Sequence, residues 1–182
     1  MNILTSTFTK KNLKIISKLE ERPLHIRELA EQAHVSPGKV QTTVKFFVKT
    51  GLATEKREKN RKIIKMNNSN PLLIKIKALI NTQQILQSDS IKKLMGHGKV
   101  GIFGSFAKGT NDEGSDVDLW IYTEKKQIDL AGLVRNLEKE IKRKVDLTVL
   151  NKTKLEHIMK NDPEFYAQLK FTSTCLNGDI FV

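Results

Sequence analysis

The sequence predicts an α/β (α+β) chain whose two parts differ in architecture and in charge. Strand-like runs alternate with helical patterns in the C-terminal part, which is typical of a small mixed sheet covered by helices. In the N-terminal part, three helical patterns precede two short basic strands. The polar, turn-rich residues 67–71 separate the two parts. We therefore expect domains at residues 1–70 and 97–182, joined by a helical linker at 71–96.

Charge and composition narrow the function classes. The net charge of the 182 residues is +12, and residues 1–70 carry 15 Lys and Arg against 6 Asp and Glu, whereas the remainder carries 17 against 14. A basic N-terminal part of this kind is typical of a protein that binds a polyanion. Apolar runs stay well short of the ~20 residues that a membrane span needs. Cys175 is the single cysteine, so an intrachain disulfide is excluded, as expected of a cytoplasmic protein.

Two amphipathic helices are expected first. Residues 8–21 place leucine and isoleucine at helical spacing, and Arg22-Pro23 ends that pattern. Residues 26–33 form the second pattern, and His25 stands at the position that would cap it.

A third helix is expected to begin at Ser36-Pro37, where a hydroxyl cap precedes a proline at the first helical position, and to end at Gly51. Apolar side chains fall on one of its faces and leave a polar face that suits a phosphate-lined groove. The apolar face is Val40, Val44, Phe47 and Val48, and the candidate DNA contacts are Lys39, Gln41, Thr42 and Lys45.

Residues 52–58 and 61–66 are expected to form a basic hairpin. Three helices followed by such a hairpin resemble the winged helix-turn-helix domains of archaeal and bacterial transcription regulators. The resemblance implies double-stranded DNA as a partner, with the third helix in the major groove and the wing on the backbone or minor groove. The candidate wing contacts are Lys56, Arg57, Lys59 and Arg61.

Residues 72–86 are expected to form one more amphipathic helix. Such a helix is able to pack on either part or on a second copy of the chain, so the sequence leaves a homodimer open.

The clearest chemical signal lies in residues 99–122, KVGIFGSFAKGTNDEGSDVDLWIY. A short apolar strand stops at Gly104, and a second strand begins at Asp116. The two-residue period of a strand puts Asp116 and Asp118 on one face. Paired carboxylates together with a phosphate suit Mg²⁺ or Mn²⁺, so the sequence predicts a metal site for phosphate chemistry.

A third carboxylate, Asp146, follows in the strand-like residues 144–150. Gly104-Ser105, ten residues, Asp116-x-Asp118 and a later Asp resemble the minimal nucleotidyltransferases of the DNA polymerase beta superfamily. The resemblance implies a small mixed-sheet nucleotidyltransferase domain that uses ATP or another nucleoside triphosphate.

The resemblance also implies roles for single residues. Lys108 stands where these proteins often carry Arg, so the charge is kept but a bidentate phosphate grip is not. The metal ligands would be Asp116, Asp118 and Asp146, the last as ligand or general base, and the triphosphate would contact Gly104, Ser105 and Lys108.

Three functions remain open at this point. The first is an adenylyl transferase tethered to a DNA-binding domain, antitoxin-like or autoregulatory, for which the resemblance implies a HEPN-type protein acceptor. The second is a DNA-binding regulator that senses a nucleotide without turnover. The third is an RNA or small-molecule nucleotidyltransferase, similar to tRNA-tailing or aminoglycoside-modifying enzymes.

Overall fold

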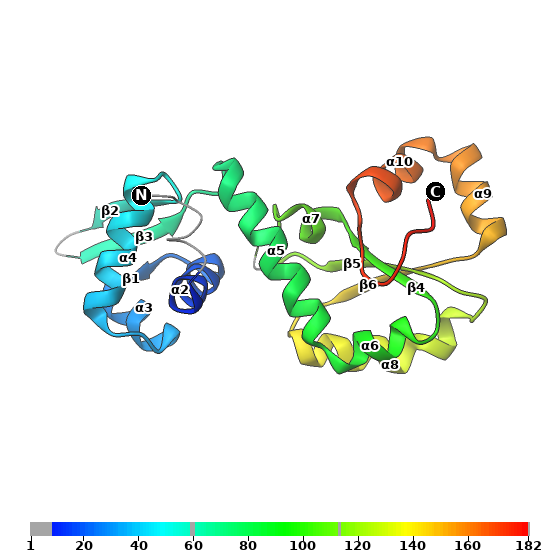
Figure 1. The fold of residues 1–182 in the computed structure, drawn as a ribbon, viewed down its shortest axis with the longest axis horizontal. Helices are drawn as coiled ribbons and strands as arrows, with labels where there is room; N and C mark the ends of the chain where they lie inside the picture. Colours follow the sequence, from blue (N-terminus) through cyan, green and yellow to red (C-terminus); the bar gives the residue numbers. More distant parts are fainter. Residues whose placement is uncertain (1–8, 59–60, 113, 182) are drawn as a thin grey trace. The chain divides into compact units, whose positions relative to one another are not determined.

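The computed structural model describes residues 9–58, 61–112 and 114–181. The chain divides between Ile74 and Lys75 into two compact units, here called unit 1 and unit 2 (Figure 1). Each unit combines helices with one sheet, which confirms the expected mixed α/β fold class. No helix in the described ranges has the length and apolar character that crossing a membrane requires.

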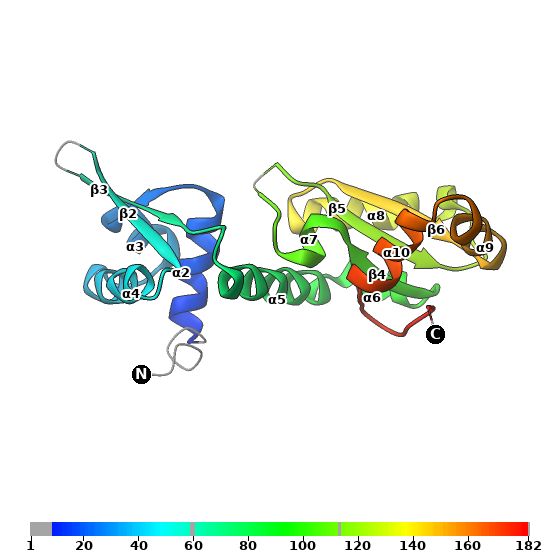
Figure 2. The same cartoon turned by 90° about the horizontal axis from the view of Figure 1, so that it is seen from above.

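Unit 1 packs helices against a small antiparallel sheet. Its strands lie in the order β1-β3-β2, and β2 and β3 pair along their whole length (Figure 2). The two-residue β1 was not expected from the sequence. The elements are α2 (Lys10–Glu21), β1 (Leu24–His25), α3 (Ile26–Ala33), α4 (Pro37–Lys49), β2 (Ala53–Glu58) and β3 (Arg61–Met66).

Two expected helix caps are wrong in detail. Ser36 precedes α4, but its hydroxyl makes no capping hydrogen bond, and Pro37 alone provides the start signal. His25 precedes α3, but its side chain does not cap the helix either. Its Nδ1 lies 3.1 Å from the carbonyl oxygen of Lys62 on β3. Val48 is 37 % exposed, because one step beyond Phe47 turns it away from the buried face of α4.

Unit 2 is built on a mixed sheet in the order β6-β5-β4-β7, in which β5 and β6 run parallel and the other pairs antiparallel. The short β7 was also not expected. The elements are α5 (Pro71–Gln87), which begins in unit 1, α6 (Asp89–Met95), β4 (Lys99–Phe103), α7 (Gly104–Lys108), β5 (Val117–Tyr122), α8 (Gln127–Ile141), β6 (Val145–Leu150), α9 (Lys152–Asn161), α10 (Pro163–Thr172) and β7 (Thr174–Cys175).

Helices cover both faces of this sheet (Figure 1). Alternate residues of β5, including Leu119, are buried in the same hydrophobic cluster as residues of α6 and α8. Trp120 points to the other face, where it is fully buried in a cluster with residues of α9 and α10. Its indole lies over Gly101, where a Cβ atom would come within 2.3 Å of the ring. Unit 2 is therefore a three-layer arrangement whose Trp120 face also carries Asp118.

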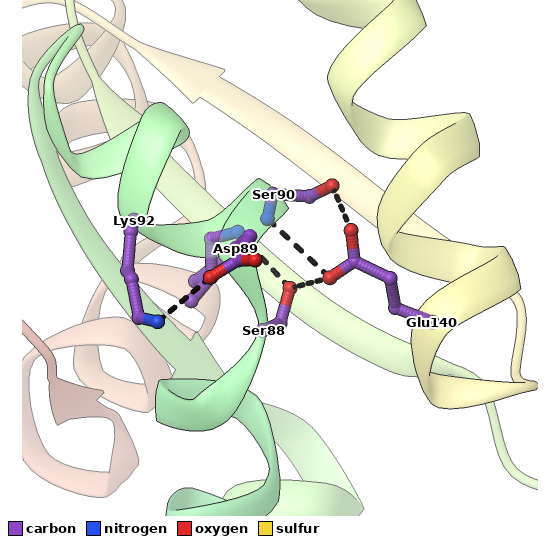
Figure 3. A network of polar contacts seen from close by, with 6 residues as sticks. Ser88, Asp89, Ser90, Lys92 and Glu140 are labelled. Atoms are coloured by element: carbon purple, nitrogen blue, oxygen red, sulfur yellow. Dashed lines mark hydrogen bonds and ion pairs between the residues drawn. The ribbon is translucent and has the colours of Figure 1, made fainter.

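A carboxylate joins two of these helices. Glu140 on α8 accepts hydrogen bonds from the hydroxyls of Ser88 and Ser90 and from the backbone N–H of Ser90 (Figure 3). Ser88 also caps α6 by accepting from Ile91 N at 3.2 Å. These hydrogen bonds lower the pKa of Glu140, the Ser88 hydroxyl contributing most.

We expect Glu140→Gln to destabilise unit 2 at neutral pH. Because the folded pKa is lowered, the stabilisation is present above the ordinary glutamate pKa of 4.5 and is lost as pH falls through the folded value. Urea unfolding followed by circular dichroism should show a gap to wild type that closes in acid. The exposed Glu156→Gln on α9 is the matched control. A gap that does not change with pH would contradict this account.

Candidate active site

Gly104 and the Asp118 carboxylate occupy adjoining space. Phe103, the last residue of β4, is the register partner of Asp118 on β5. Gly104 follows with φ +66°, a left-handed backbone conformation that residues other than glycine rarely adopt. A Cβ at Gly104 would stand 1.9 Å from Asp118 Oδ2. The backbone therefore comes so close to this carboxylate that only glycine fits at position 104.

Asp118 and Asp146 are register partners on the parallel strands β5 and β6. Residues paired in this way point to the same face, and neighbouring strands lie about 5 Å apart. Asp116 comes directly before β5 and is exposed, as is Asp146, whereas Asp118 is half-buried. The fold thus gathers at one end of the sheet the three carboxylates that the sequence analysis singled out.

These carboxylates influence one another. Burial raises the pKa of Asp118, and the negative charges of Asp146 and Asp116 raise this pKa further. Accumulated negative charge of this kind favours either a bound proton or a bound cation. The arrangement is therefore suited to a ligand that brings positive charge.

The donor set fits a hard divalent cation that is shared with a substrate. In the described residues, no three His, Cys, Asp or Glu side chains stand close enough to form a complete metal site on their own. Mg²⁺ is usually held by one or two carboxylates together with substrate phosphates, because it keeps an octahedral oxygen shell. The residues present agree with such a shared site and not with an all-protein cage.

The short helix α7 carries the other three candidates, Gly104, Ser105 and Lys108. Ser105 is half-buried and Lys108 is exposed at the last position of the helix. Gly109 ends α7 in a left-handed conformation, and Thr110 N donates to the carbonyl oxygen of Ser105. The structure thus places Gly104 beside Asp118, with Ser105 next in the chain and Lys108 one turn further along α7.

The candidate DNA contacts of unit 1 lie on α4 and β2. Gln41, Thr42 and Lys45 are exposed on α4, and Lys39 is partly exposed. The buried residues of α4 are Val40, Thr43, Val44 and Phe47, so this polar face is separate from the core. Lys56 and Arg57 are exposed on β2. Lys59 and the side chain of Arg61 lie outside the described residues.

The sequence analysis missed the residues that hold the segment leading to Asp116. Arg143 donates to the carbonyl oxygens of Asp112 and Ser115, at 2.8 and 3.0 Å. On α5, Lys77 donates to the main-chain carbonyl oxygen of Asn111, and Asn81 donates to the Asn111 side-chain oxygen, at 2.9 and 2.7 Å. A signal for the α5 pair was present, since both residues interrupt a face of the helix that is otherwise apolar.

We expect Gly104→Ala to lower the stability of unit 2 by at least about 1–2 kcal/mol, the cost of the left-handed backbone alone. Gly132→Ala on α8 is the matched control, because a Cβ there meets nothing within 4 Å. It should be neutral or stabilising by up to about 1 kcal/mol. Thermal melting of both variants checks the contrast, and equal melting temperatures would contradict the close approach described above.

Comparison with known proteins agrees with this geometry. No curated protein matches the chain. Residues 85–170 match a family model described as a nucleotidyltransferase domain, and this range contains α7 and all three carboxylates. Residues 85–170, which make up most of unit 2, are therefore similar to nucleotidyltransferase domains.

Proposed function

We propose that unit 2 transfers a nucleotidyl group from ATP or another nucleoside triphosphate to an acceptor hydroxyl, with the help of Mg²⁺ or Mn²⁺. The observation that carries this proposal is the position of Asp118, in register beside Asp146 and against the backbone of Gly104. Two carboxylates and a glycine that lets the backbone approach are what a triphosphate with its metal requires.

Asp116 and Asp118 are the residues that would hold the metal. When bound, the metal neutralises charge on the triphosphate and on the pyrophosphate that leaves. The pKa of the half-buried Asp118 is raised by burial and then by its charged neighbours, so Asp118 gains most from that neutralisation.

Asp146 is the residue that serves the acceptor. Its carboxylate is exposed, so a hydroxyl on a large acceptor can reach it from solvent. The hydroxyl oxygen attacks the α-phosphorus, the bond from this phosphorus to the pyrophosphate oxygen breaks, and the hydroxyl proton passes to Asp146. Ser105 orients the phosphate oxygens by donating a hydrogen bond, and Lys108 adds a point charge nearby.

We propose a protein as the acceptor and ATP as the donor. The likeness to minimal nucleotidyltransferases, which modify a HEPN-type partner, supports this choice. The exposure of both Asp116 and Asp146 also supports it, because an acceptor much larger than a nucleotide then has access to the reacting end of the sheet.

With ATP labelled at the α-phosphate, label should enter a protein of the cell extract and pyrophosphate should appear. Asp118→Asn should abolish metal-dependent nucleotide binding, whereas Asp146→Asn should suppress transfer more than binding. Both substitutions should lower the rate of nucleotidyl transfer by at least about a hundredfold. Glu124→Gln, exposed just beyond the opposite end of β5, is the matched control.

The other outcomes decide between the alternatives. Transfer of label from the γ-phosphate alone would contradict nucleotidyl transfer. Label in RNA or in a small molecule would replace the protein acceptor. Tight nucleotide binding without pyrophosphate release would identify a nucleotide-sensing regulator.

We also propose that unit 1 binds double-stranded DNA as a winged helix. The order of three helices and a hairpin, a charge of +9 on residues 1–70 and a polar exposed face on α4 support this proposal. Lys56 and Arg57 on β2 would contact the phosphate backbone, and Gln41 and Thr42 would face the bases.

Affinity for DNA should fall steeply with salt, by about 0.9 log unit per log unit of salt for each phosphate contacted. The double variant Lys56→Ala and Arg57→Ala should reduce this slope by the amount expected for about two phosphate contacts, and should weaken binding to all DNA sequences alike. Gln41→Ala should instead change the sequence preference. Fluorescence anisotropy of the full chain across a salt series measures both effects. Lys139→Ala, exposed on α8, should behave as wild type. Absence of duplex binding at low salt would refute the proposal.

A further inference from the structure

Two polar side chains of α5 are buried inside unit 2. Lys77 and Asn81 stand four residues apart, so they share one face of the helix, and each is only 3 % exposed. Buried lysines are rare unless their ammonium group has a partner. Lys77 Nζ donates to the carbonyl oxygen of Asn111 at 2.9 Å. A charged group is thus committed to a main-chain carbonyl.

Asn81 extends this grip to two segments of the active site. Its Nδ2 donates to Asn111 Oδ1 at 2.7 Å and to the carbonyl oxygen of Phe106 at 2.8 Å. Phe106 belongs to α7, the helix that begins at Gly104, and Asn111 begins the segment that ends at Asp116. Asn111 is itself only 6 % exposed. α5 therefore holds α7 and the start of the Asp116 segment with the same two side chains.

Arg143, which comes later in the chain, holds the same segment near Asp116. Arg143 donates to the carbonyl oxygens of Asp112 and Ser115, and its guanidinium lies 5.9 Å from the ring centroid of Phe106. Ser115 immediately precedes Asp116, and the Ser115 hydroxyl bonds Asp112 at 2.7 Å. The ten residues between Ser105 and Asp116 are thus fixed near both ends.

Stability alone does not account for a buried ammonium group. Burying a charge with no opposite charge beside it costs free energy. The ammonium group of Lys77 bonds Asn111, at the start of the segment that carries the candidate metal ligand Asp116. These contacts indicate that Lys77 and Asn81 set the position of the segment relative to α7.

We propose that Lys77 and Asn81 are positioning residues for nucleotidyl transfer, which fix Asp116 relative to the phosphate-binding turn at Gly104 and Ser105. This inference rests on the proposed function of unit 2. Residues that orient metal ligands from outside typically change metal affinity or activity by about 10–100-fold when they are replaced.

The test uses the full chain with Lys77→Met, which keeps an unbranched apolar stem and removes the donor. Lys75→Met, exposed on the same helix, is the matched control. At saturating ATP, the Mn²⁺ concentration needed for half-maximal transfer should rise about 10–100-fold in Lys77→Met, at an unchanged melting temperature. Amide exchange at residues 114–117 should also become faster in Lys77→Met alone. A merely structural role would move the melting temperature and leave the metal requirement unchanged.

Should Lys77→Met fail to fold, Asn111→Ala decides, because it removes the acceptor of Asn81 and keeps the main-chain carbonyl that Lys77 binds. The same readouts apply with the same expected direction. A metal requirement and amide exchange equal to wild type would overturn the inference and leave the proposed function intact. Absence of metal-dependent nucleotide binding in the wild-type chain would instead overturn the proposed function.

Discussion

Repulsion between carboxylates that the backbone holds side by side is the constraint on which unit 2 depends. Asp118 and Asp146 cannot move apart, because they are register partners on paired strands. Asp118 cannot turn toward β4 without meeting the backbone of Gly104. Burial raises the pKa of Asp118, and the negative charges of Asp146 and Asp116 raise this pKa further. Because the fold alone holds these carboxylates together, their negative charge is in place before a cation binds.

The secondary structure of this chain could largely be predicted from local patterns. The Asp118 strand, the Asp146 strand and the helix at residues 26–33 depend on short-range periodicity, and their observed bounds lie within a residue of the expected ones. The cap at His25 failed because its ring lies instead beside the carbonyl oxygen of Lys62, a tertiary contact that a local pattern does not contain. The exposed Ser36 makes no capping hydrogen bond, and Pro37 provides the start signal of α4.

The candidate site was predictable as a set of residues but not as a geometry. Spacing indicated that Asp116 and Asp118 share a face, whereas the parallel pairing of β5 with β6, which puts Asp146 beside them, depends on the topology of the sheet. The grip of Lys77 on Asn111 joins residues 34 positions apart in the sequence. No local pattern contains such a contact, although a lysine on the apolar face of a helix is a sign that some partner is needed.

The burial of Trp120 gives unit 2 an optical signature of its own. Trp120 is the single tryptophan of the chain, it is fully buried in unit 2, and the ring of Phe181 packs edge-on at 5.6 Å from it. Indole emission shifts when water reaches the ring, so intrinsic fluorescence follows the opening of unit 2 while unit 1 contributes nothing to it. Since Trp120 lies two residues from Asp118 on the same face of β5, the same emission is a natural reporter of events at the carboxylates.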